Sequence, residues 1–161
     1  MSNEQTQNVN MESTDAVMLE ADTPTERYLT FRSDGITMGV STNYVIEILT
    51  DHIITELPRV PDFIRGIINM RGQIVPIIDI RLKMGKPRSE YTDTTCIIVL
   101  DIDSVYIGII VDSVQQVLDV DKTQISAIPV EDQQGLVNGM ISLSSQEVLL
   151  FLDCEELIQA Y

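Results

Sequence analysis

Glu47 and Asp79 are the side chains in this sequence best placed for acid–base chemistry. Each lies beside apolar sequence, and apolar surroundings raise the pKa of a carboxyl group so that it can act as a general acid or base. Two such groups together would indicate a carboxylate-dependent hydrolase or a small-molecule site. The simpler interpretation is that Glu47 lies on the surface of a short helix and that Asp79 caps another helix.

Other catalytic or ligand-binding patterns are missing from the sequence. His52 is the single histidine, and without a second histidine or paired cysteines it does not indicate a zinc site. Asp101 and Asp103, like Asp119 and Asp121, lack the remaining ligands of a calcium loop and indicate turns. No phosphate-binding glycine loop, dinucleotide-binding motif or G-x-S-x-G motif occurs. The sequence therefore predicts a protein that is not an enzyme and that has no metal or cofactor.

The composition favours a mainly β fold. The chain has 161 residues, which suits one domain or two small lobes with a shared core. Hydrophobic residues make up 44% and aromatic residues 5%, without tryptophan, so the core must consist mainly of Ile, Val and Leu. Side chains branched at Cβ pack well on the pleated surface of a sheet, and this core composition therefore predicts strands.

The formal net charge of −15 argues against binding to nucleic acid or to anionic lipid. The basic residues are nevertheless concentrated in one window. Seven of the ten are Arg59, Arg65, Arg71, Arg81, Lys83, Lys86 and Arg88. This window is either a chance cluster on a solvated surface or a contact face for an acidic partner, to which it would give specificity and a faster association rate.

The ends of the chain and its cysteines carry little further information. Cys96 and Cys154 are far apart in sequence and predict two small buried residues rather than a disulfide framework. Residues 1–25 contain five acidic residues and no basic or aromatic ones, which predicts a disordered tail ahead of a domain over residues 26–161. No apolar run is long enough for a signal peptide or a membrane span, and we expect a cytoplasmic protein without membrane insertion.

Residues 58–82 are the most informative segment. Two apolar runs, residues 66–70 and 73–80, lie on either side of Arg71 and Gly72. Because glycine accepts positive φ without strain, this pair predicts a tight hairpin turn. Such a turn would present the guanidinium of Arg71 at the end of a stiff β element, where a partner could contact it.

The rest of the hydrophobic pattern predicts mostly strands, together with an internal repeat. Expected strands are 28–32, 36–40, 53–57, 95–101, 104–111, 114–120, 136–143 and 146–152, and expected helices are 43–50, a turn from Asp79 through Met84, and one from Asp153. Residues 34–49 align with 103–118 at an offset of 69, so that Gly39 matches Gly108 and Val45 matches Val114. Either generic hairpin similarity or a duplication explains this. A duplication would give two small β barrels with a crevice at their joint.

The order of motifs from Val45 to Asp112 resembles the chemotaxis coupling protein family, the CheW-like adaptors. The matching stretches are 45–48 (VIEI), 57–58 (LP), 61–66 (PDFIRG), 68–72 (INMRG), 74–81 (IVPIIDIR) and 108–114 (GIIVDSV). The resemblance covers about residues 27–158 and implies two intertwined SH3-like, five-stranded β-barrel subdomains with short helices and a C-terminal helix.

The resemblance also implies a function without catalysis. Proteins of this family link the cytoplasmic tip of methyl-accepting chemoreceptors to the regulatory domain of a chemotaxis histidine kinase. This chain would then be a monomer when free, located in the cytoplasm and recruited to membrane-associated receptor arrays. The pathway that it serves, whether flagellar, pilus-related or developmental, stays open.

Carried over residue by residue, the resemblance predicts two groups of binding residues. The receptor-binding group is Val45, Glu47, Ile48, Arg71 and Gly72. The second group, a groove for either receptor or kinase, is Gly66, Val111, Val114 and Val117. Gly66 would let its strand pass closely beneath the receptor-binding group. We further expect at least one of Val45 and Val114 to be substantially exposed.

Overall fold

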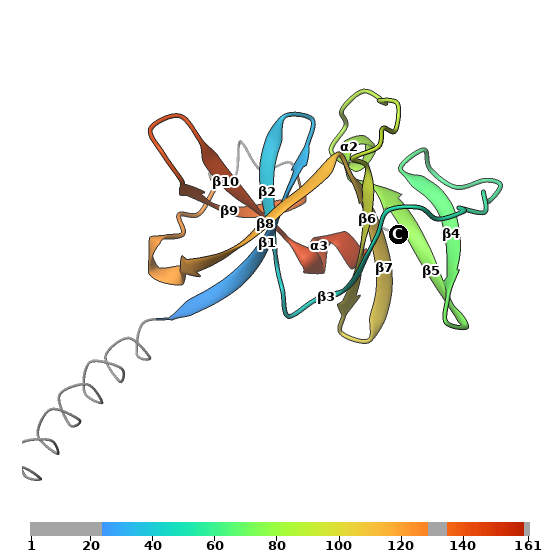
Figure 1. Cartoon of the computed structure of the whole chain (residues 1–161), viewed down its shortest axis with the longest axis horizontal. Helices are drawn as coiled ribbons and strands as arrows, with labels where there is room; N and C mark the ends of the chain where they lie inside the picture. Colours follow the sequence, from blue (N-terminus) through green and yellow to red (C-terminus); the bar gives the residue numbers. More distant parts are fainter. Residues whose placement is uncertain (1–23, 129–134, 160–161) are drawn as a thin grey trace, which may run out of the picture.

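The computed structural model describes residues 24–128 and 135–159, which form two five-stranded sheets (Figure 1). In spatial order the A sheet contains β8 (Ser113–Asp121), β1 (Thr25–Ser33), β2 (Ile36–Ser41), β10 (Val148–Leu152) and β9 (Val137–Ser142). The B sheet contains β3 (Val45–Leu49), β6 (Cys96–Ile102), β7 (Val105–Val111), β5 (Gln73–Asp79) and β4 (Ile64–Met70). The helical elements are α2 (Ile80–Lys83), the 3₁₀ turn η1 (Lys122–Gln124) and α3 (Cys154–Gln159).

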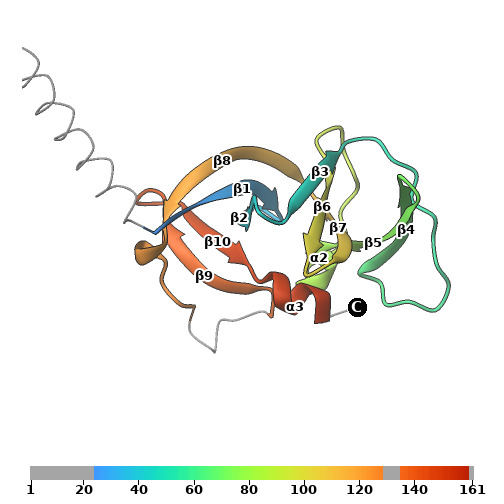
Figure 2. The same ribbon diagram turned by 90° about the horizontal axis from the view of Figure 1, so that it is seen from below.

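The two halves of the chain are duplicated and intertwined. β3 follows β2 in sequence but pairs with β6 in the B sheet, and β8 follows β7 but pairs with β1 in the A sheet. Each half of the chain, β1–β5 or β6–β10, therefore supplies two strands to one sheet and three to the other, and Figure 2 shows β8 arching alongside β1. The aligned glycines occupy equivalent places: Gly39 faces β10 and Gly108 faces β5, each in a parallel pair. The repeat is a structural duplication, and the predicted mainly β fold is confirmed.

Two predicted elements are wrong. The sequence pattern predicts a helix over residues 43–50, but Val45–Leu49 form β3, with Leu49 opposite Ile97 of β6. Four of these five residues are apolar, a pattern that fits a helix or a strand, so pairing with a distant strand decided the outcome. Residues 53–57 do not form a strand and contribute a single bridge, in which Thr55 and Ile67 exchange two backbone hydrogen bonds of 2.9 Å.

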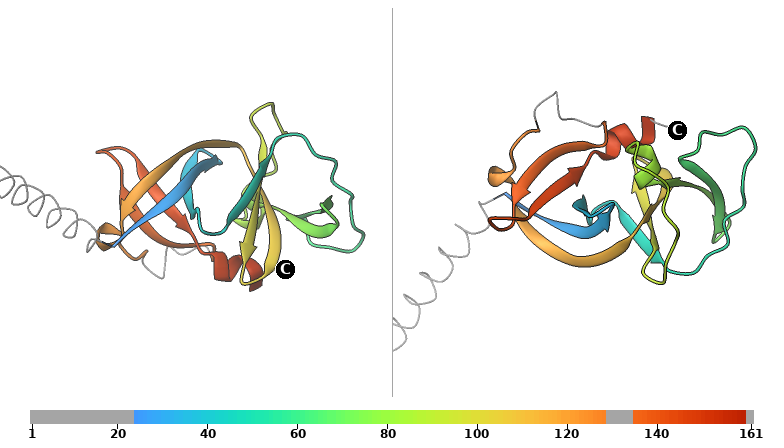
Figure 3. Two further views of the ribbon diagram at one scale, coloured as in Figure 1. Left: turned by 60° about the horizontal axis from the view of Figure 1, so that its bottom comes forward. Right: turned by 90° about the horizontal axis from the view of Figure 1, so that it is seen from above.

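The predicted hairpins and caps are confirmed. β1 and β2 form one hairpin and β6 and β7 another. Asp79 caps α2 by accepting hydrogen bonds from the backbone N–H of Arg81 at 3.0 Å and of Leu82 at 3.4 Å. α3 begins directly after Asp153 and lies at the joint beside β6 (Figure 3). No described helix is long and apolar enough to cross a membrane.

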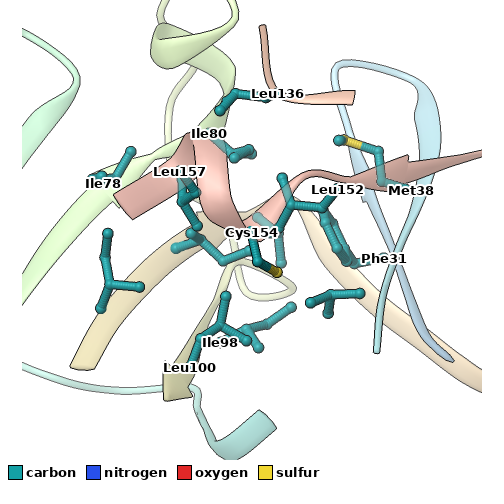
Figure 4. Packing of buried hydrophobic residues seen from close by; sticks show 14 of the residues in the cluster. Phe31, Met38, Ile78, Ile80, Ile98, Leu100, Leu136, Leu152, Cys154 and Leu157 are labelled. Atoms are coloured by element: carbon teal, nitrogen blue, oxygen red, sulfur yellow. The ribbon is translucent and has the colours of Figure 1, made fainter. Parts of the chain in front are cut away.

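Strand alternation sends one face of each central strand into a core that both sheets share. In β6, Ile98 and Leu100 enter this shared core, whereas Ile97 and Val99 enter a smaller cluster inside the B sheet. Phe31 of β1 and Leu157 of α3 fill the shared core from the other side (Figure 4). The centre of the joint is thus packed with apolar side chains. An apolar core therefore fills the centre of the joint, where a duplication was expected to leave a crevice, because both sheets have an apolar face to bury there.

The predicted boundary between tail and domain lies almost wholly outside the described residues. Of residues 1–25 the structure describes Pro24 and Thr25, and Thr25 is already the first residue of β1.

Candidate functional site

The β4–β5 hairpin ends in a tight turn formed by Arg71 and Gly72. Their φ angles are 54° and 84°, and Met70 pairs with Gln73 across the turn, as in a type I′ hairpin. The Gly72 N–H donates to Asn69 Oδ1 at 3.0 Å. The Arg71 side chain is 78% exposed. The sequence-based prediction of a tight turn that presents a guanidinium is confirmed.

Glu47 lies beside this turn. Its Oε1 is 3.5 Å from Nη2 of Arg71. β3, which carries Glu47, and β4 are opposite edges of the B sheet, and in a flat sheet four strand spacings, about 19 Å, would separate them. The B sheet therefore curves until its edges face each other. An ion pair this exposed contributes only about 0–1 kcal/mol, so both charges remain available to a partner.

Gly66 is needed for a close backbone approach. Its φ is 141°, and a Cβ atom at this position would lie 2.1 Å from the carbonyl oxygen of Thr55. β4 thus passes directly against the segment that follows β3. The approach is to Thr55 and not to the residues of β3 that the sequence predicted to bind a receptor, so Gly66 shapes the B sheet rather than offering a surface.

The predicted apolar contacts differ widely in exposure. Ile48 and Val117 are 39% and 52% exposed, on β3 and β8 respectively. Val45 and Val114 are half-buried and pack against the shared core, so the expectation that one of them is substantially exposed is wrong. Val111 is 1% exposed and offers no surface to a partner. Val45 and Val114 lie at or next to the start of β3 and β8, where the chain passes from one sheet to the other beside the shared core.

The structure therefore brings together Glu47, Arg71 and Gly72 but separates the remaining residues. Ile48 is adjacent to Glu47 in β3 and so points to the opposite face of the strand. Sequence reasoning missed two exposed residues: Ile46, next to Glu47 in β3, at 38% and Ile74, two positions after Gly72 in β5, at 58%. The period of two in β3 and β5, with Val75 and Ile77 buried, is the signal that could have identified them.

Comparison with known proteins identifies the family. Residues 27–161 match the CheW-like domain family. The chain belongs to this family. It is 32% identical over 145 residues to "Chemotaxis protein CheW" of Klebsiella aerogenes, covering 88% of this chain and 87% of that protein. It is 26% identical to "Protein FrzA" of Myxococcus xanthus, over 84% and 87% of the two chains.

A solved structure supports the CheW-like fold. The scaffolding protein TtCheW from Thermoanaerobacter tengcongensis superposes with a TM-score of 0.75 and 27% sequence identity. The match covers 81% of this chain and 90% of TtCheW. The arrangement of two five-stranded subdomains with short helices is thus that of a CheW-like protein.

The geometry of this CheW-like domain does not support paired carboxylates. Asp79 is 3% exposed, and besides capping α2 it accepts a hydrogen bond of 3.0 Å from the Tyr91 hydroxyl. Burial, with the nearby Asp79 carboxylate as a further cause, raises the pKa of Tyr91 to about 12. Glu47 pairs with Arg71 at the other end of β5, about 20 Å along the strand from Asp79. The two carboxylates therefore cannot act on one substrate.

The cysteines and histidine have structural or surface positions. Burial raises the pKa of the Cys154 thiol to about 12, which leaves almost no reactive thiolate at neutral pH. Cys96 is partly exposed and also free, and His52 is exposed. Within residues 24–128 and 135–159, no three His, Cys, Asp or Glu side chains are grouped so that they could hold a metal ion.

The basic window is not one uniform contact face. Arg81 is only 16% exposed and binds Asp34 and Asp112, each at 2.6 Å. Lys83 lies 4.2 Å from the ring centre of Phe63, a cation–π contact. Arg71 stands apart at the hairpin tip.

Proposed function

We propose that this protein is a non-catalytic chemotaxis scaffold that couples methyl-accepting chemoreceptors to a chemotaxis histidine kinase. Its membership of the CheW-like family supports this role, the names of its relatives indicate chemotaxis, and TtCheW is described as a scaffolding protein. The observation that carries the proposed receptor contact is the exposed Arg71 on a rigid turn beside Glu47, which leaves a charge of each sign weakly paired where the two edges of the B sheet face each other. The kinase would bind through its regulatory domain.

A receptor tip that presents helices would contact this edge through both charge and apolar area. The exposed Ile46 and Ile48, which alternate with Glu47 and so lie on the other face of β3, would supply apolar area for anchors one helical turn apart. Exposed Ile74 would add apolar area close to the hairpin tip. Arg71 and Glu47 would exchange their mutual contact for charges on the partner, which mainly improves specificity and the association rate. Val45, being half-buried, would contribute less.

The second group of residues would serve either partner from the β8 side. Val117 is the exposed member of that group, with half-buried Val114 beside the joint. In this proposal Val111 and Gly66 act through packing. The protein would be a monomer when free and would work in the cytoplasm at membrane-associated receptor arrays.

Chemical-shift mapping with the ¹⁵N-labelled full chain tests the proposal. On addition of a chemoreceptor-tip fragment, we expect shifts concentrated in residues 43–48, 69–74 and 108–117. The regulatory domain of the kinase is titrated in a second experiment, and simultaneous binding of both partners is measured by analytical ultracentrifugation. Shifts confined to residues 1–25 or 130–146 would contradict the assigned surface, and failure of both titrations would contradict the scaffold role.

A further inference from the structure

Three hairpin turns in the described chain place two consecutive residues at positive φ. They are Asp34-Gly35 at 53° and 73°, Arg71-Gly72 at 54° and 84°, and Asp103-Ser104 at 50° and 69°. Asp-Gly is among the favoured pairs for such a turn, because glycine has no Cβ and aspartate tolerates the left-handed region. Arginine at the first place and serine at the second are both disfavoured.

The two disfavoured turns share a side-chain brace. Asn69 Oδ1 accepts a hydrogen bond from the Gly72 N–H at 3.0 Å, and Asp101 Oδ1 accepts one from the Ser104 N–H, also at 3.0 Å. Each acceptor lies two residues before the first residue of its turn. At the favoured Asp34-Gly35 turn, the corresponding residue is Arg32, which donates to the Gly35 carbonyl oxygen at 3.0 Å instead. The brace thus accompanies the turns whose residues resist the left-handed conformation.

We propose that Asn69 is a positioning residue for Arg71, holding the strained turn so that the guanidinium points to the β3 edge beside Glu47. The inference rests on the proposed function of Arg71 as a partner contact. A hairpin built for stability alone would carry Asn or Asp at position 71. The strain at Arg71, an exposed side chain beside Glu47, is therefore consistent with a requirement for this arginine in binding.

The position of Asn69 separates a positioning role from a role in stability. Asn69 is exposed, and its side chain is held by the bond that it accepts from the Gly72 N–H. Replacing it by alanine therefore leaves no buried cavity and removes this hydrogen bond. Loss of that bond should affect the Gly72 amide and the orientation of Arg71, while the cores stay intact.

The experiment compares full-length Asn69→Ala, Asn69→Asp and Asp101→Ala with the natural chain. We expect Asn69→Ala to exchange the Gly72 amide hydrogen about fivefold faster and to bind a chemoreceptor-tip fragment about fivefold more weakly, the factor expected from one net hydrogen bond. Asn69→Asp should keep the exchange rate of the Gly72 amide and the affinity close to those of the natural chain. Asp101 shows that a carboxylate oxygen can accept the hydrogen bond in such a turn. Asp101→Ala, the matched control, should accelerate exchange only at Ser104 and leave the affinity unchanged.

Several outcomes would overturn the positioning role. Unchanged hydrogen exchange at Gly72 in Asn69→Ala would show that the hydrogen bond from Gly72 to Asn69 does not hold the turn. Unchanged affinity for the receptor-tip fragment would show that binding does not require this hydrogen bond. Weak binding that Asn69→Asp does not restore would indicate that Asn69 contacts the partner directly. If Arg71→Glu retains full affinity, the proposed partner contact itself fails and the positioning role with it. If Arg71→Glu loses affinity but Asn69→Ala does not, only the positioning role fails.

Discussion

At the scale of single residues, Arg71 is highly exposed and makes only one weak ion pair among the described residues. Its ion pair to Glu47 spans 3.5 Å, and with the Arg71 side chain 78% exposed, solvent screens the pair. Arg81 is the opposite case, since its guanidinium is mostly buried and binds two carboxylates at 2.6 Å. Two arginines ten residues apart therefore have different roles, and burial with hydrogen-bond geometry distinguishes them.

Arg71→Glu should abolish binding to a receptor-tip fragment while changing the free energy of unfolding by only about 0.5 kcal/mol, as for most surface substitutions. The change reverses the exposed charge and places a second carboxylate beside Glu47. Isothermal titration calorimetry and urea unfolding measure the two effects. Arg27→Glu is the matched control, because Arg27 is also exposed and ion-paired, with Asp119 at 3.2 Å, but lies in the A sheet. Severe destabilisation by Arg71→Glu would contradict the contact role.

At the scale of elements, the β4–β5 hairpin depends on two glycines for different reasons. Gly72 has a φ of 84°, and a Cβ atom added to it would meet nothing within 4 Å, so it is required by conformation alone. Gly66 has both an unfavourable φ and the Thr55 carbonyl in its way. The first glycine sets the turn, and the second lets β4 pass against the segment that leads out of β3.

Gly66→Ala should therefore destabilise the fold by about 2–5 kcal/mol, because backbone strain and a clash with main-chain atoms add. Gly72→Ala should cost about 1–2 kcal/mol, from the left-handed conformation alone. Urea unfolding of the two variants gives the comparison. If both substitutions lower the free energy of unfolding equally, then the backbone near Thr55 can move to accommodate a Cβ atom at position 66 at little cost.

At the scale of the whole molecule, one polar cluster joins the two halves beside the shared core. Arg81, just after β5, binds Asp34 in the β1–β2 turn and Asp112 between β7 and β8. Asp112 Oδ2 also accepts from the Asp34 N–H at 2.9 Å. The cluster thus ties an A-sheet hairpin to the point where the chain crosses from one sheet to the other. Figure 1 shows the three segments converging there.

Arg81→Met should destabilise the protein by about 3–5 kcal/mol, since it leaves two carboxylates close together without their cation. Combining it with Asp34→Asn and Asp112→Asn should recover part of this loss, because no unpaired charge then remains. Urea unfolding followed by NMR at amides in both sheets provides the measurement. We expect one common midpoint, since the lobes share a core. Separate midpoints for the A and B sheets would contradict this coupling.

The sequence alone determined the features that depend on neighbouring residues. Arg71-Gly72 specifies a tight turn, Asp79 specifies a cap, and the short apolar runs rich in β-branched residues in β6 and β7 specify strands, because each rests on local φ and χ1 preferences or on a side chain reaching the adjacent backbone. The CheW-like resemblance was also within reach of the sequence, because it rests on the order of short motifs along the chain. The exposure of Ile74 could also have been predicted from the sequence, because residues in β5 alternate between the two faces of the sheet.

Only the tertiary structure decided which strands exchange, which valines are buried and which charges meet. Val45–Leu49 became β3 because β6, about 50 residues later, offered an edge to pair with. Val111 is buried because the second sheet covers it, and Glu47 meets Arg71 only because the B sheet curves. Each of these outcomes depends on contacts between residues far apart in the chain, and such contacts form only when the two halves fold around one core.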